Sequence, residues 1–420
     1  MTTKREIEVY AGWHGIEKPF RMGILTSERL KGKEVFSFAY DHQWLEFGPA
    51  QNIDPQLQWY TGPQYLTGNK SNFGVFLDSS PDRWGRVLMR RREAALARQQ
   101  ERKENTLFET DYLLGVFDSG RMGGLRFKLD DDGGFLSNDK EMATPPWTSL
   151  GALEHASMRL EMSDPADDPQ YLKWLNLLFA PGTSLGGARP KANVLDKNQH
   201  LWIAKFPSYH DENNIGGWEI VVHELAQKAG LDVAESLAKK FSGNYHTFIT
   251  KRFDRNEKSE RVHFASALTL LGLNDGLDHT DGVSYLHLAE FLVQQGASPV
   301  KDLEQLWRRI VFNICVSNAD DHLRNHGFLL SDKGWILSPA FDLNPIAHAK
   351  GLKLNISEND NALDLNLARE VAPVFRLNPA RANAIIETVE KAVRQWERIA
   401  DKYAIPKKEQ TEMASAFSSH

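Results

Sequence analysis

The strongest constraint on this chain's fold is a dense polar cluster that follows an apolar helix pattern in the second half of the sequence. Apolar residues recur at helical spacing from Leu303 to Ile314, and the segment SNADDHLRNHGFLL comes next. Four of its side chains suit chemistry: Asp320, Asp321, His322 and Asn325. Two short apolar runs joined by the turn SDKG then lead to SPAFDLNP, which holds Asp342. Because a hairpin folds its two ends together, we expect the polar cluster and Asp342 to lie side by side.

Carboxylates and a carboxamide gathered at one point match the needs of phosphoryl transfer, which depends on positioning and charge neutralisation. Asp320 would accept the proton of the acceptor hydroxyl, while Asn325 and Asp342 would coordinate magnesium through oxygen. The spacing D-x-x-x-x-N matches the end of the kinase catalytic loop. The structural alternative is a capped helix end rich in Asn and Asp turn residues. That alternative does not account for the apolar-flanked Asp342 directly after the hairpin.

The segment SLGGARPKANV, residues 184–194, has the composition of a loop that covers phosphates. Gly186 and Gly187 permit close backbone approach to phosphate oxygens, and Arg189 and Lys191 add positive charge. The segment does not match the P-loop pattern G-x-x-x-x-G-K-[ST]. An ordinary glycine turn is the alternative, and we expect the whole stretch 184–206 to form a hairpin.

A lysine on a strand and a glutamate on the next helix would complete a kinase site. The strand HLWIAKFP carries Lys205 on one face with Leu201 and Ile203, so the lysine needs an anionic partner or must reach water. The helix expected at 215–230 carries Glu219 in its first turn, where it either pairs with Lys205 or is simply favoured by the helix dipole. HELAQ in that helix ends in Gln rather than His, so it holds no zinc pair.

The remaining composition is that of an ordinary globular chain. The 420 residues carry a net charge of −6, which excludes a polyanion binder as the general design. Eight Arg and Lys residues do gather in the helix expected at 81–104; a solvated face explains them best, and a partner or nucleic-acid surface is the alternative. Residues 136–169 hold four prolines and should be irregular.

Features of cellular location all favour the cytoplasm. Cys315 is the single cysteine, so no intramolecular disulfide can form. The start, MTTKREIEVYAGW, turns charged at once and is not expected to be a signal peptide. No apolar run reaches the roughly 18 residues that a membrane span needs, so we expect no membrane partner.

Taken in order, SLGGARPKA, WIAKFP, ITKRFDR, NADDHLRNHGF and SPAFDL resemble the HipA-type serine/threonine kinases of bacterial toxin–antitoxin modules. The resemblance implies that Asp320 is catalytic and that Asn325 and Asp342 bind Mg²⁺. It also implies a set of residues that contact ATP, to which we add His322 from the polar cluster: Gly186, Gly187, Ala188, Arg189, Pro190, Lys191, Lys205, Lys251, Arg252 and Phe253.

The resemblance further implies regulation and partners. Ser184 sits where family members carry a serine that is autophosphorylated, which ejects the loop and silences the enzyme. The acceptor would be a protein hydroxyl, for example on a translation factor or an aminoacyl-tRNA synthetase. A HipB-like helix-turn-helix antitoxin would neutralise the kinase, and DNA would be met only through that antitoxin. Asn318-Ala319 replace the usual His-Arg before the catalytic aspartate, and F-D-L replaces D-F-G.

We therefore predict an α+β, bilobed, protein-kinase-like fold with a β-rich N-terminal subdomain and a mostly helical C-terminal lobe. The expected domains are residues 1–105, 106–250 and 251–420. A small-molecule phosphotransferase is one alternative, although that group lacks an N-terminal subdomain of about 100 residues. A non-catalytic subunit of an antitoxin–DNA complex is the other, although such a subunit would not need Lys205, Asp320, Asn325 and Asp342 together.

Overall fold

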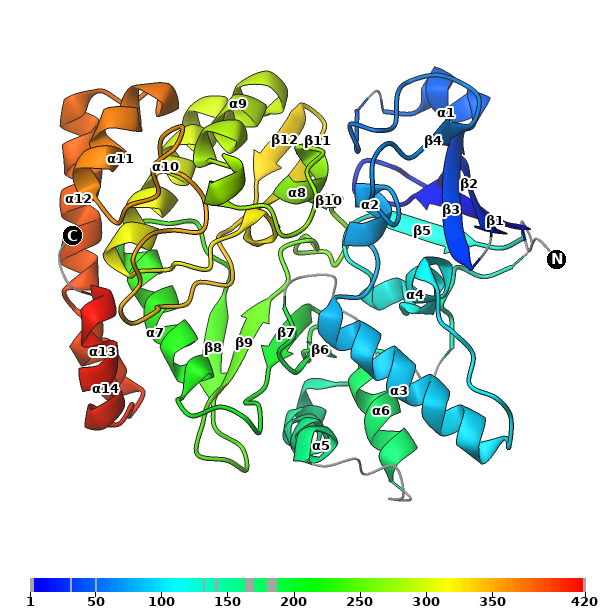
Figure 1. Ribbon diagram of the computed structural model, residues 1–420, viewed down its shortest axis with the longest axis horizontal. Coiled ribbons are helices and arrows are strands. Elements are labelled where there is room, and N and C mark those ends of the chain that lie inside the picture. Colours follow the sequence, from blue (N-terminus) through cyan, green and yellow to red (C-terminus); the bar gives the residue numbers. More distant parts are fainter. Residues whose placement is uncertain are drawn as a thin grey trace. The chain divides into compact units, whose positions relative to one another are not determined.

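The computed structural model describes residues 4–30, 32–49, 51–130, 133–139, 143–162, 170–179 and 187–417. The chain forms two compact units, drawn in Figure 1. The first unit is Met1–Tyr209 with Asp254–Ala265, and the second is His210–Phe253 with Ser266–His420. Helices and strands occur in both units, which confirms the α+β class. The three domains predicted from the sequence have other boundaries than these two units, and they stay a prediction.

An antiparallel sheet with the strand order β4-β3-β2-β1-β5 forms the centre of the first unit's N-terminal part. Side chains alternate in burial along β1, where Ile7, Val9 and Ala11 are fully buried, as a strand with one face on a core requires. The β-rich character predicted for the N-terminal part is confirmed. The strand bounds are β1 Lys4–Ala11, β2 Phe20–Leu30, β3 Lys33–Tyr40, β4 Gln64–Tyr65 and β5 Leu125–Lys128.

Six α-helices belong to the described part of the first unit: α1 His42–Phe47, α2 Gly74–Asp78, α3 Arg83–Gln99, α4 Glu109–Gly115, α5 Leu150–Met162 and α6 Tyr171–Phe179. The prediction that 136–169 is irregular is wrong at α5, where Leu153, Ala156 and Leu160 lie on one buried helix face. The spacing of these residues outweighs the prolines, which all lie outside the helix.

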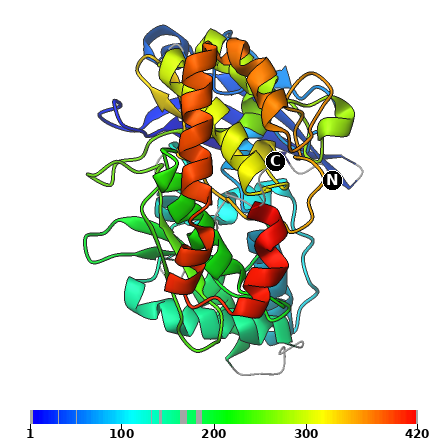
Figure 2. The ribbon, with the colours of Figure 1, turned by 90° about the vertical axis from the view of Figure 1, so that its left-hand side faces the viewer.

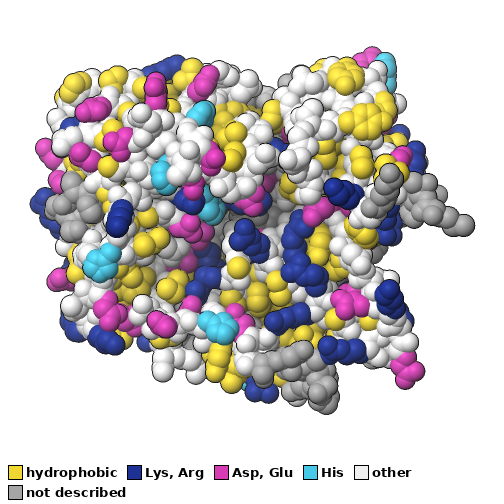
Figure 3. All heavy atoms as spheres, in the orientation of Figure 1, with side chains coloured by type: hydrophobic (Ala, Val, Ile, Leu, Met, Phe, Trp, Pro, Cys, Tyr) yellow, Lys and Arg dark blue, Asp and Glu magenta, His cyan; other side chains and the backbone are white. Residues whose placement is uncertain are grey.

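The basic helix is α3, which begins after Asp82, whose carboxylate caps it by accepting a hydrogen bond from Gly85 N at 2.8 Å. Lys and Arg side chains gather along this helix on the surface in Figure 3. Arg86 forms a bidentate pair with Glu109, with contacts of 2.6 and 2.7 Å. Part of the basic run is thus matched within the unit, which favours the structural explanation.

A buried arginine of the first unit donates hydrogen bonds to backbone carbonyls of the same unit. Arg121 is fully buried and donates to four carbonyl groups, those of Ser79, Leu113, Val116 and Leu136. Burial lowers the pKa of Arg121 to about 10, which still leaves it charged at neutral pH. One cation therefore holds together carbonyl groups from four places in the chain.

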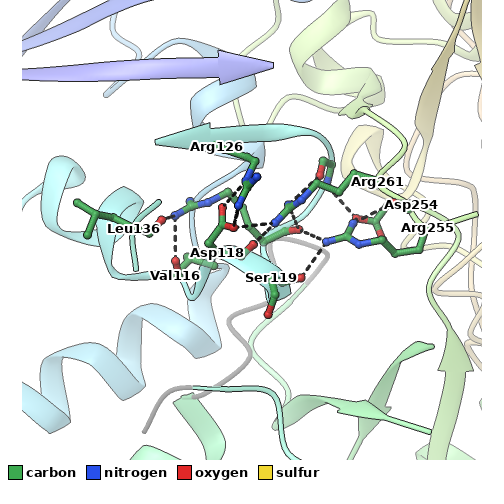
Figure 4. Close-up of polar contacts among 10 residues, drawn as sticks. Val116, Asp118, Ser119, Arg126, Leu136, Asp254, Arg255 and Arg261 are labelled. Atoms are coloured by element: carbon green, nitrogen blue, oxygen red, sulfur yellow. Dashed lines mark hydrogen bonds and ion pairs between the residues drawn. The ribbon is translucent and has the colours of Figure 1, made fainter. Parts of the chain in front are cut away.

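Residues 254–265 return to the first unit through two more arginines, shown in Figure 4. Arg255 pairs with Asp254 at 2.6 Å and donates to Ser119 O at 2.9 Å. Arg261 lies 3.3 Å from the Asp118 carboxylate, which also accepts from Arg126 at 2.6 Å. Burial disfavours the charged form of Asp118, but Arg261 and Arg126 hold its pKa below the usual range.

The hairpin predicted at 184–206 is confirmed for its described part, β6 Lys191–Leu195 paired antiparallel with β7 Leu201–Lys205. Lys191 lies opposite Lys205 in the register. Like charges placed directly opposite each other repel, so each lysine needs its own anion. For Lys191 that anion is Asp82, whose Oδ2 lies 2.6 Å from Nζ in an almost fully buried pair.

In the second unit, α10 is the central helix and packs against α9, α11 and α12. The helix α7 packs against α12, α13 and the strands β8 and β9, and Figure 2 shows the long α12 with α13 and α14 near the C-terminus. The helix bounds are α7 Ile215–Lys228, α8 Ala267–Leu270, α9 Tyr285–Gln295, α10 Pro299–Cys315, α11 Leu365–Val371, α12 Pro379–Val393, α13 Trp396–Lys402 and α14 Lys407–Met413.

The strands of the second unit form two hairpins, β8 with β9 and β11 with β12. The bounds are β8 Ser236–Lys239, β9 Thr247–Lys251, β11 Gly327–Ser331 and β12 Gly334–Leu337, and β10 Phe264–Ser266 lies where the chain passes from the first unit into the second. Both the predicted helix ending at Ile314 and the hairpin after it are confirmed. Among the described helices, none is long and apolar enough to cross a membrane.

Candidate active site

The catalytic-loop candidate, residues 316–326, follows α10 and precedes β11. Asp320 is exposed at its tip. The backbone carbonyl of Asp320 accepts hydrogen bonds from His322 N at 2.9 Å and from Asn325 Nδ2 at 3.1 Å. The loop therefore curls back on itself, and the carboxamide of Asn325 is held beneath the residue that carries the exposed carboxylate.

The adjacent aspartate, Asp321, has the opposite environment. It is buried, and its Oδ2 lies 2.6 Å from Tyr285 Oη, 2.7 Å from Asn313 Nδ2 and 2.7 Å from His326 Nε2. Burial raises the cost of its charge, but His326 and the hydrogen bonds hold the pKa of Asp321 below the usual range. The sequence presents two neighbouring carboxylates, and their environments leave only Asp320 open to an acceptor.

Asp342 lies beside this loop, as the hairpin predicted. Ser338 N donates to Gly327 O at 2.9 Å across the closed hairpin, and Ile346 N donates to Ser317 O at 3.1 Å. Asp342 itself adopts a left-handed backbone conformation, with φ at 58°. Non-glycine residues adopt that conformation uncommonly, and aspartate is among those that tolerate it best.

The residues present fit a magnesium ion. Asn325 Oδ1 is buried and has no hydrogen-bond partner in the described structure, so it is available to a metal ion. Asp342 supplies a carboxylate nearby, and hard cations prefer such oxygens. No group of three or more His, Cys, Asp or Glu side chains suited to a metal occurs among the residues described. Mg²⁺ needs fewer protein ligands, because it retains waters and binds substrate phosphates.

Part of the predicted phosphate-covering loop can be located. Ser184 and Gly186 lie outside the described residues. Gly187 has a φ of 80°, which suits glycine, and Ala188 beside it is exposed. Arg189 donates to Phe206 O at 3.4 Å, and Pro190 O accepts from Phe206 N at 2.8 Å.

Lys191 is buried with its ammonium on Asp82, and it also donates to Gly187 O at 3.2 Å. Its charge is therefore matched inside the protein, and its contact with ATP stays a prediction. Lys205 ends β7 and is half-buried. Glu219 is buried in α7, one residue beyond the first turn, which contradicts the first-turn position that the helix-dipole alternative required. These two residues belong to different units, and their ion pair stays a prediction.

The predicted adenine-contacting residues lie at the end of β9. Lys251 is the last residue of that strand, Arg252 is buried, and Phe253 lies against Phe341 with ring centroids 5.5 Å apart. This contact brings the segment beside the residue that precedes Asp342. Nucleotide-contacting and metal-binding candidates of the second unit are thus neighbours.

Sequence reasoning missed the residues that hold Asp321, namely Tyr285, Asn313 and His326. Asn313 is a polar residue inside the apolar pattern of α10, and His326 ends the polar cluster. A polar side chain on a buried helix face signals a buried partner, and that signal was available for Asn313. Tyr285 carried no such signal.

Comparisons with known proteins identify the family of this chain. The family model described as the HipA-like C-terminal domain matches residues 183–396, just over half of the chain. A serine/threonine-protein kinase toxin HipA of Shewanella oneidensis is 25% identical over 264 residues, covering 56% of this chain and 59% of the relative. A putative kinase of Haemophilus influenzae is 26% identical over 165 residues, covering 35% of this chain and 48% of the relative. The matches thus span about half the length of these curated relatives.

A solved structure extends the likeness to nearly the whole chain. The Shewanella oneidensis HipA, in a complex with HipB and its operator DNA, aligns with a TM-score of 0.64 over 98% of this chain and 95% of that one. The identity is 18%, so this likeness shows the fold alone. The HipA-like fold predicted from sequence is confirmed.

Proposed function

The chain belongs to the HipA-like C-terminal domain family, and from this premise we propose that it is an ATP- and Mg²⁺-dependent serine/threonine kinase of the HipA toxin type. Two features of one loop carry the proposal. The carboxylate of Asp320 is exposed, and the amide oxygen of Asn325 is buried without a hydrogen-bond partner in the described structure. A buried amide oxygen that is available to a ligand, close to an exposed carboxylate, supports a bound cation at this loop.

Each residue has a role in the proposed reaction. Asp320 accepts a hydrogen bond from the acceptor hydroxyl and takes its proton as the phosphoryl group transfers. Asn325 and Asp342 would hold Mg²⁺, which neutralises charge on the phosphates when bound. Lys205 faces the phosphates, with Glu219 as its supporting partner.

The remaining ATP contacts come from three places: the glycine-rich loop, the segment Lys251–Phe253, and His322. The loop covers the phosphates, and Lys251–Phe253 meet the adenine. His322 Nδ1 is buried and, among the described residues, has no hydrogen-bond partner. A nitrogen in that condition beside Asp320 supports a polar contact with the nucleotide.

Partners and regulation are part of the proposal. The solved relative is a HipA with HipB and operator DNA, which supports a HipB-like antitoxin here, with DNA met through that antitoxin. The substrate is a protein hydroxyl, and the enzyme acts in the cytoplasm. Ser184 autophosphorylation would add about −1.5 to −2 charges to a loop that covers anionic phosphates, and the loop should then swing away. Mass spectrometry should find phosphate on Ser184 and lose it in Asp320→Asn.

Calorimetry with a non-hydrolysable ATP analogue tests the proposal. Binding should require Mg²⁺ and weaken in Lys205→Ala and Asn325→Ala, with Lys333→Ala in the exposed β11–β12 turn as the matched control. Equal affinity in all four proteins would remove Lys205 and Asn325 from the site. A small-molecule phosphotransferase is disfavoured by the five-stranded N-terminal sheet, and phosphate transfer to a protein rather than to a metabolite would separate the two.

A further inference from the structure

A backbone motif ends α10 and places Asn318 between that helix and the catalytic-loop candidate. Ser317 adopts a left-handed conformation with φ at 49°, and its N–H donates to Ile314 O at 3.2 Å. Asn318 N donates to Asn313 O at 2.9 Å. These are the two hydrogen bonds of a Schellman motif, in which the chain leaves a helix in a fixed direction. The direction of the catalytic-loop candidate is therefore set here.

Side chains reinforce this motif on the helix side. Schellman motifs usually carry an apolar contact between the two residues that Asn313 and Asn318 occupy. Here the contact is a hydrogen bond, from Asn318 Nδ2 to Asn313 Oδ1 at 3.1 Å. The Nδ2 of Asn313 then donates to Asp321 at 2.7 Å, so the same carboxamides also fix the residue after Asp320. All three side chains are almost completely buried.

On its other side, Asn318 reaches the segment that carries Asp342. Its Oδ1 accepts from Asn344 N at 3.4 Å, and Asn344 Nδ2 lies 3.3 Å from Asp342 Oδ1. Hydrogen bonds thus run from Asp321 through the carboxamides of Asn313 and Asn318 to the backbone N–H of Asn344, whose own side chain contacts Asp342. These contacts join the loop of Asp320 and Asn325 to the carboxylate that must meet the same ion.

We propose that Asn318 is a positioning residue that sets the distance between the two proposed magnesium ligands, Asn325 and Asp342, before the ion binds. The inference rests on the proposed kinase function and adds the device that assembles its metal site. Asn318 is not among the residues that we propose to contact the nucleotide or the ion. It acts through Asn344 and Asn313, so its loss loosens the ligands while leaving the carboxylate of Asp320 in place.

The test compares Asn318→Ala with a matched control, Asn355→Ala. Asn355 is equally buried in the second unit and donates to His279 O at 2.9 Å, a carbonyl outside the proposed site. Two quantities are measured: hydrogen exchange of the peptide covering residues 342–346, and the Mg²⁺ concentration that half-saturates binding of a non-hydrolysable ATP analogue. Asn318→Ala should speed exchange in that peptide and raise the Mg²⁺ requirement about tenfold, the equivalent of one buried hydrogen bond. Asn355→Ala should leave both at the wild-type values.

A second variant protects the test if Asn318→Ala fails to fold. Asn344→Ala keeps the backbone N–H that meets Asn318 and removes only the link to Asp342, at a half-buried position. It should raise the Mg²⁺ requirement about threefold and leave hydrogen exchange of residues 342–346 unchanged, because only one half-buried hydrogen bond is lost.

Three results would overturn the inference. They are unchanged exchange in residues 342–346 of Asn318→Ala, faster exchange with an unchanged Mg²⁺ requirement, and an equal rise in Asn355→Ala. Failure of the kinase function looks different, since the wild-type protein itself would then bind no nucleotide with Mg²⁺. That result would refute the kinase proposal and the positioning role with it.

Discussion

The arginine cluster of the first unit and the catalytic-loop candidate of the second unit are both buried and polar, but their hydrogen bonds end differently. Arg121 directs its terminal nitrogens to four backbone carbonyls, and Asp118 is matched by Arg126 and Arg261. In the loop, Asn325 Oδ1 and His322 Nδ1 are buried without a partner in the described structure. The comparison separates buried charges that groups of the same unit match from a buried amide oxygen and ring nitrogen that are available to the ligand we propose.

The largest effect expected from this comparison follows from Asp320→Asn. The substitution keeps the shape of an exposed side chain and removes the proton acceptor, so phosphoryl transfer should fall by about 10²- to 10⁴-fold. Thermal stability should not change, because Asp320 is exposed. Radiolabel transfer from ATP measures the loss, with Asp332→Asn in the exposed hairpin turn as control. Full transfer in Asp320→Asn would mean that the loop is not catalytic.

Arg121→Met should lower stability and leave nucleotide binding unchanged. The substitution leaves four buried carbonyls without their donor, and we expect the free energy of unfolding to fall by about 3–4 kcal/mol. Nucleotide affinity in the protein that remains folded should be unchanged. Urea denaturation gives the first quantity and calorimetry the second. A loss below about 1 kcal/mol would contradict the scaffolding role assigned to this cluster.

The stability of the first unit should also depend on pH through a buried histidine. Burial lowers the pKa of His263 to about 3, and its ring stacks on Trp13 with centroids 4.8 Å apart. The unfolded chain, with a pKa near 6.5, therefore binds a proton that the folded chain refuses. Stability from this group is complete above about pH 6.5 and is lost as the pH falls, by about 2 kcal/mol at pH 5.

The measurement is the free energy of unfolding at pH 7 and pH 5 for the wild type and His263→Phe, which keeps an aromatic ring against Trp13. The pH-dependent loss should be about 2 kcal/mol smaller in the variant. An equal loss in both proteins would assign the acid sensitivity to other groups.

The smallest effect is expected on the surface of the first unit. Arg102 pairs with Glu93 at 2.6 Å, but the arginine lies at the surface, where solvent screens the charge. Arg102→Gln should leave the melting temperature within experimental error, in contrast to Arg121→Met. A clear drop in thermal denaturation would show that burial does not separate the two kinds of arginine.

Local patterns in the sequence predicted most elements that shape the site. The apolar spacing of α10, the hairpin after it and the helix ending before Gly230 all depend on neighbours within a few residues. The division of roles between Asp320 and Asp321 could not be predicted, because it depends on Tyr285, 36 residues away. The partner of Lys191 was equally hidden, since Asp82 lies 109 residues earlier. Contacts between residues so far apart in the chain produce no periodic pattern in a single sequence.

The arginine cluster also bears on how the protein is made. Arg255 and Arg261 belong to a segment that leaves the ribosome after the first 44 residues of the second unit, His210–Phe253, have already been synthesised. Until then Asp118 lacks Arg261, and the carbonyl of Ser119 lacks Arg255. Nascent domains usually fold in order from the N-terminus, but here the first unit must wait for part of its neighbour. A fragment that stops after Tyr209 would expose this unfinished surface, which makes it a poor choice for separate expression and a ready substrate for chaperones.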